Sequence, residues 1–147
     1  MQATTRRSPV LRNLLAVIAG FGIGSVVNMG LIGLSGHAIP PPAGSDTATM
    51  EGLQASMHLF GPQHFVFPFL AHALGTLMGA LVAARIAASR TLAVAMVVGA
   101  LFFAGGVAAV AMLPAPLWFE ALDLVVAYFP MAWLGWRLGA RSLPLNL

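Results

Sequence analysis

Four long apolar stretches constrain this chain more than any other feature of its sequence. They cover residues 14–34, 65–84, 92–113 and 117–136. About 20 apolar residues in an α-helix cross the roughly 30 Å hydrocarbon core of a bilayer. Inside that core a backbone must satisfy its own hydrogen bonds, which favours helices. The sequence therefore predicts an all-α fold, a four-helix transmembrane bundle that forms a single membrane domain over residues 1–147.

The composition excludes a protein with a water-facing surface. Hydrophobic residues make up 59% of the chain and charged residues 7%, whereas charged residues make up about 25% of an average soluble domain. The basic residues cluster near the ends of the apolar stretches. Their excess therefore indicates a membrane protein and not a protein that binds nucleic acid. The absence of cysteine excludes disulfides, thiolate metal sites and cysteine nucleophiles.

The arginines predict the orientation of the spans. They stand before the first span, between the second and third, and after the fourth, and none lies in the long connection at 35–64. Because basic residues favour the cytoplasmic side, both termini are predicted to be cytoplasmic and 35–64 to be the outer loop. The basic residues are Arg6, Arg7, Arg12, Arg85, Arg90, Arg137 and Arg141.

The outer loop is predicted to contain a short amphipathic helix. The run Pro40-Pro41-Pro42 cannot enter a helix interior. Asp46 or Thr47 can cap a helix that follows it, and Gly61-Pro62 ends that helix. Such a helix lies flat at the outer interface with its apolar face toward the membrane. That face consists of Met50, Leu53, Met57 and Phe60.

Two rows of small residues predict close packing between transmembrane helices. Gly20 and Gly24 are four residues apart in the first span, and Gly75 and Gly79 are four apart in the second. Small residues at this spacing let helix backbones approach closely in lipid. The sequence leaves open whether these rows meet within one chain or join two copies in a homo-oligomer.

Polar side chains inside three spans are predicted to lie at one depth. Asn28, His72 and Asp123 each lie six or seven residues from the outer end of their span, which is about 10 Å at 1.5 Å per residue. An ionisable group facing lipid at this depth costs about 2.5–3.5 kcal/mol, so these groups should face inward. Thr76, one turn below His72, and Glu120, one turn above Asp123, extend the layer.

This polar layer has two interpretations. His72 and Asp123, with Glu120 above them, are candidate catalytic groups that could move a proton or act as a base. Alternatively, the layer only joins helices, with each hydrogen bond contributing about 0.6–2 kcal/mol. Ionisable residues inside a membrane more often serve a function than only join helices, which favours the first interpretation.

A divalent metal ion is the cofactor that the layer could hold, since imidazole and carboxylate groups bind such ions. No tightly spaced motif such as His-Glu-x-x-His occurs, so the sequence leaves both the metal and an enzymatic activity open. The candidate metal ligands are His58, His64, His72, Glu120 and Asp123.

Three segments carry a resemblance to other proteins. The runs at 39–46, 56–60 and 69–76 resemble a group of small four-span bacterial inner-membrane proteins to which no activity is assigned. The resemblance implies a multi-pass protein of the bacterial inner membrane and no particular site residues.

Three functions therefore compete. The first is a membrane protein whose polar layer opens toward the periplasm, where it binds a metal ion or performs acid–base chemistry. The second is a small oligomeric transporter or proton-coupled carrier, although the apolar inner halves of the spans offer no further polar group to an ion. The third is an accessory subunit of a larger membrane complex.

Overall fold

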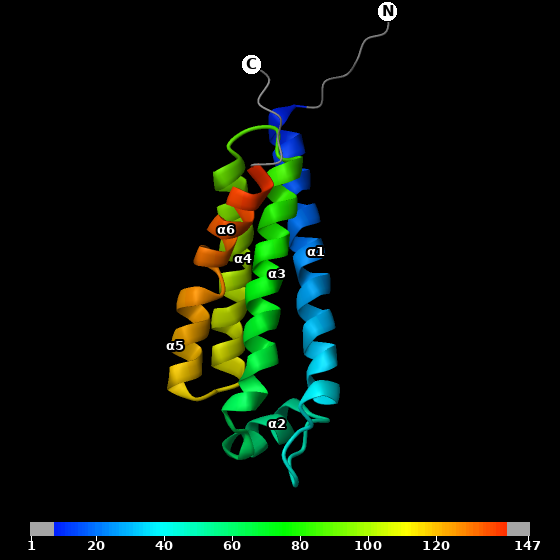
Figure 1. Cartoon of the computed structure of the whole chain (residues 1–147), viewed down its shortest axis with the longest axis vertical. Helices are drawn as coiled ribbons and strands as arrows, with labels where there is room; N and C mark the ends of the chain where they lie inside the picture. The colour runs from blue at the N-terminus through cyan, green and yellow to red at the C-terminus, as the bar shows by residue number, and fades with distance from the viewer. Residues whose placement is uncertain (1–7, 141–147) are drawn as a thin grey trace, which may run out of the picture.

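The computed structural model describes residues 8–140, and within them it has helices and no strands. Four helical segments are long and apolar enough to cross a membrane: Pro9–Ala38, Pro62–Ile86, Thr91–Met112 and Leu117–Ala140. The predicted four-helix bundle is therefore confirmed (Figure 1). The α-helices are α1 (Pro9–Ala38), α2 (Met50–Ser56), α3 (Val66–Ile86), α4 (Thr91–Met112), α5 (Leu117–Val126) and α6 (Phe129–Ala140), with short 3-10 turns η1 at Met57–Leu59 and η2 at Pro62–Phe65.

Helix α3 is the centre of the bundle and packs against α1, α4 and α6. Small side chains make this possible, since Ala71, Ala80, Ala83 and Ala84 are all fully buried. Figure 1 shows α1 along one side of α3 and the segments α4 to α6 along the other. The core of the protein therefore lies along α3, and the outward faces of the other helices are apolar.

The glycine rows of α1 and α3 face each other within one chain. A Cβ atom at Gly24 would overlap the carbonyl oxygen of Gly75, and one at Gly20 would overlap that of Gly79. The reverse also holds, because a Cβ at Gly75 or Gly79 would lie 2.9 Å or 2.8 Å from the facing glycine oxygen. These backbones are thus already in contact, so the same rows are not free to join a second copy.

The fourth apolar stretch, predicted as one span over 117–136, is not one continuous helix. It consists of two helices, α5 and α6, that are separated at residues 127 and 128. Pro130 causes this break, because proline lacks an N–H and its ring clashes with the carbonyl four residues earlier. The break brings Tyr128 to the middle of the bundle, where its side chain is 1% exposed.

The outer helix begins later and ends earlier than predicted. Thr49 caps α2, and its hydroxyl accepts a hydrogen bond of 2.9 Å from the backbone N–H of Gly52. The predicted cap at Asp46 or Thr47 is wrong, because the Asp46 carboxylate instead accepts from the N–H of Ala48 in the preceding turn. Helix α2 lies across the end of the bundle (Figure 1), where the side-chain amide of Gln54 donates to the carbonyl of Met112.

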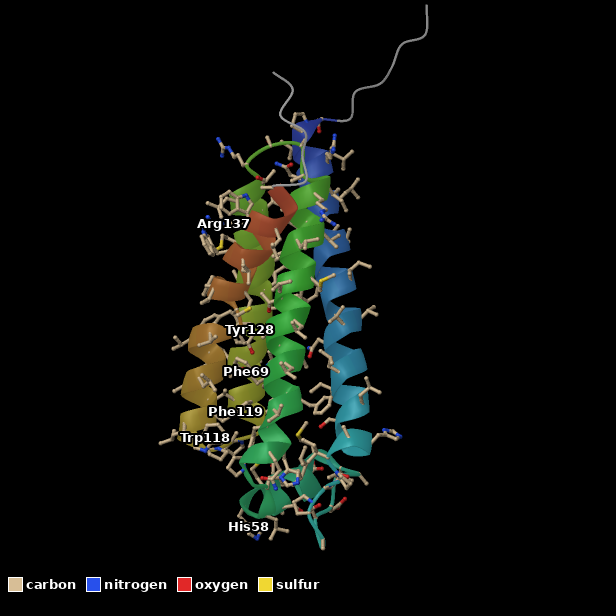
Figure 2. The ribbon with its side chains drawn as sticks, viewed as in Figure 1. His58, Phe69, Trp118, Phe119, Tyr128 and Arg137 are labelled. Atoms are coloured by element: carbon tan, nitrogen blue, oxygen red, sulfur yellow. The ribbon has the colours of Figure 1, made fainter. Side chains whose placement is uncertain are left out.

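The opposite end of the bundle carries the described arginines. The start of α1 and the end of α6 both lie there (Figure 1), while Figure 2 shows Arg137 and Trp118 at opposite ends. Arg12 donates from Nε to the carbonyl of Ile86 at 2.7 Å, and the Asn13 side chain accepts from the N–H of Ala88 at 2.8 Å. Arg6, Arg7 and Arg141 lie outside the described residues.

Candidate functional site

Two buried side chains, Asp123 and Tyr128, meet the half-buried His72 where α3 passes the break between α5 and α6. His72 Nδ1 lies 2.9 Å from both carboxylate oxygens of Asp123. Tyr128 Oη donates to Asp123 Oδ2 at 2.8 Å and lies 3.0 Å from His72 Nδ1. Asp123 is 3% exposed and Tyr128 is 1% exposed. The predicted contact between His72 and Asp123 is therefore present, and Tyr128 contacts both residues.

The geometry determines which nitrogen of His72 is available. An ionised carboxylate only accepts hydrogen bonds, so the tautomer with hydrogen on Nδ1 fits the contact with Asp123. The other ring nitrogen, Nε2, makes no hydrogen bond to any described residue, and 21% of the His72 side chain remains exposed. A neutral imidazole held in this way offers an oriented proton acceptor at Nε2.

A large cavity lies on the outer side of His72. Its volume is about 500 Å³, and its floor includes His72, Asp123 and Glu120. Leu53, Met57 and Phe60 of the outer loop also line it, so α2 and the turn after it lie beside the polar layer. Three of the four residues of the predicted apolar face therefore line the cavity and do not face the membrane, while Met50 is 44% exposed.

A second, smaller cavity lies on another side of the same histidine. Its volume is about 270 Å³, and it lies between α1 and α4, with His72 and Tyr128 in its wall. The two cavities share three lining residues: His72, Gly106 and Ala109. Gly106 is required here, because a Cβ atom at that position would overlap the Tyr128 ring. His72 thus stands at the junction of the two cavities.

Two other members of the predicted layer have unsatisfied oxygens. Asn28 lines the smaller cavity beside His72, but its Oδ1 is buried and has no hydrogen-bond partner among the described residues. Thr76 is fully buried with its hydroxyl oxygen likewise unpartnered, and it lines neither cavity. Buried polar atoms are nearly always hydrogen-bonded. The Oδ1 of Asn28 is enclosed by protein, so the group of this side chain that a bound molecule could contact is its amide N–H.

The remaining candidates have local roles. The Glu120 carboxylate accepts a 2.9 Å hydrogen bond from the N–H of Ala115, at the start of α5. His64 bonds to the backbone of Gly61 and Pro40, and His58 bonds to the carbonyl of Ala55. Figure 2 shows His58 at the far end of the loop, away from Tyr128.

The described residues contain no group of three or more His, Asp or Glu side chains that could hold a metal ion. The five candidate ligands named from the sequence therefore do not form one cluster.

Tyr128 is the functional residue that sequence reasoning missed. It is the only tyrosine of the chain and follows Asp123 by five residues, a spacing that does not place two side chains on one face of a continuous helix. The two meet because the helix is interrupted between them. Pro130, two residues after a lone polar aromatic in an apolar span, was the available signal.

Comparisons of the chain with protein-family models, with curated proteins and with solved structures find no match.

Proposed function

We propose that this chain is a bacterial inner-membrane protein that binds a neutral or cationic small molecule in its outer half and exchanges a proton with it through His72. Both termini are cytoplasmic in this proposal, and the outer cavity opens toward the periplasm. One observation carries it: His72 Nδ1 is held by Asp123, which Tyr128 also contacts, while Nε2 has no hydrogen-bond partner among residues 8–140 and lies beside the cavities.

The charges of the outer cavity support the choice of ligand. Its wall contains the carboxylates of Asp123 and Glu120, and no arginine is among its lining residues. Most of the other lining residues are apolar, including Ile32, Leu53 and Phe119. An anion would meet like charge in a setting of low dielectric, where repulsion is strong, whereas a neutral or cationic molecule would not.

The arginine distribution supports the orientation. The described arginines lie at the end of the bundle away from α2, and basic residues concentrate on the cytoplasmic side of inner-membrane proteins. The resemblance of the outer loop and second span to small bacterial inner-membrane proteins points to the same membrane.

The state of the His72 ring tests the proposed function. In protein reconstituted into nanodiscs and labelled with ¹⁵N-histidine, we expect the neutral ring to carry its hydrogen on Nδ1 and to take up a second hydrogen on Nε2 as the pH is lowered. A His72→Gln variant identifies the signal among the four histidines. A His72 signal that does not change with pH would mean that the residue only joins helices, and would overturn the proposal.

A further inference from the structure

We infer that the smaller cavity is a binding site for a hydroxyl-bearing apolar molecule, a lipid alcohol or alkylphenol, that reaches His72 from within the bilayer between α1 and α4. The inference rests on the proposed function for the role of His72. It adds the chemical class of the ligand and the route by which the ligand enters.

The position of the cavity gives the route. Phe21 and Leu101, from α1 and α4, line it while 39% and 43% of their surfaces remain exposed on the outside of the bundle. Gly105, between them, has open space where a side chain would begin. Gly105 lies seven residues from the outer end of α4, about 10 Å deep, so this side of the bundle faces hydrocarbon. A molecule dissolved in the bilayer therefore meets the opening directly.

The hydrogen bonds of the wall give the ligand class. Ser25 donates its hydroxyl hydrogen to the carbonyl of Phe21 at 2.8 Å, and Tyr128 donates its own to Asp123. Their oxygens and His72 Nε2 are left as acceptors. Asn28 adds an amide N–H that can donate, whereas its Oδ1 is enclosed by protein.

A hydroxyl group matches this wall because it can donate to His72 Nε2 and accept from the Asn28 amide N–H. A hydrocarbon would leave both of these groups without a partner, which costs about 1–3 kcal/mol for each. A carboxylate would bring only acceptors to a wall already rich in them. The rest of the lining, with Phe102, Ala109 and two glycines, suits an apolar tail.

Photolabelling tests this inference. The probe is a 4-alkylphenol with a diazirine in its alkyl chain, and the matched probe is the alkylbenzene without the hydroxyl. Both are added to the full chain in nanodiscs, and labelled peptides are mapped by mass spectrometry. We expect the phenol to label the cavity segments of α1 and α4 about tenfold more than the alkylbenzene, a ratio that corresponds to about 1.4 kcal/mol.

Three variants sharpen the test. Gly105→Leu places a side chain at the opening, and Gly22→Leu adds the same side chain on α1 outside the cavity. At both positions a Cβ atom meets no other atom within 4 Å. We expect phenol labelling to fall about tenfold in the first variant and to stay unchanged in the second. Asn28→Leu should reduce labelling by the phenol to the level of the alkylbenzene.

Equal labelling by the two probes, or labelling that Gly105→Leu leaves unchanged, would overturn the inference. The ring protonation of His72, measured in the same samples, separates this result from the proposed function. If His72 still changes protonation with pH while the labelling fails, the route and ligand class are wrong and the acid–base role stands.

Discussion

Replacing Asp123 by leucine is expected to lower the free energy of unfolding by about 1–3 kcal/mol for each buried donor left without an acceptor. The loss comes from His72 and Tyr128, which both bond to this carboxylate, because leucine accepts no hydrogen bond from either. Reversible unfolding in bicelles, followed through the tryptophan fluorescence, measures this change in the free energy of unfolding.

A double-mutant cycle gives the control for that prediction. If His72 and Asp123 interact as the distances indicate, the double variant His72→Leu with Asp123→Leu should be more stable than the sum of the single changes allows, by about 0.5–3 kcal/mol. Strict additivity would contradict a direct interaction between the two side chains.

The second large effect is expected at the contact between α1 and α3. Gly24→Val should lower the free energy of unfolding by about 3 kcal/mol, because its Cβ would overlap the Gly75 carbonyl and the Phe102 ring, and overpacking a tight contact forces backbones apart.

Gly22→Val is the matched control for that change, since a side chain there meets no atom within 4 Å. It lies on the same helix and adds the same side chain, so it should leave the bicelle unfolding free energy nearly unchanged. Equal effects of the two substitutions would mean that α1 does not pack on α3 through this face.

Sequence reasoning recovered what depends on length, depth and charge. Twenty-residue apolar runs give the four spans. Counting residues from the span ends brought His72 and Asp123 to one level, and the structure has them in contact. The rise per residue of a helix is constant, so the depth of a residue in the membrane follows from the number of residues between it and the end of its span.

The rotation of the helices could not be predicted from the sequence. Pro130 favours a break in the fourth span, but which side chain that break brings to Asp123 could not be predicted. The face that Asn28 presents depends on how α1 turns against α3, which the glycine contacts determine. Tyr128 reaches Asp123 only because the span is interrupted before Pro130. Gly135 and Gly139 pack on the backbone of α3 beside Ala80 and Ala84, but the four-residue spacing of each pair does not by itself say which helices meet.

The loop side chains illustrate a second limit. His58 bonds to nearby backbone and lines neither cavity, whereas His64 lines the outer cavity with His72 while it bonds to the backbone of Gly61 and Pro40. Sequence spacing says little about such groups, because a loop held by caps and turns has no fixed periodicity.

The central claim is that His72 lies beside a cavity open to the outer side, and single-cysteine labelling tests it most directly. The chain has no native cysteine. Ala109 lines both cavities, whereas its neighbour Ala108 lines neither.

In right-side-out vesicles, with Ala48→Cys in the outer loop as the positive control, a small water-soluble thiol reagent should modify Ala109→Cys and leave Ala108→Cys unmodified. Protection of both cysteines, or equal modification of both, would contradict an outward-opening cavity at His72.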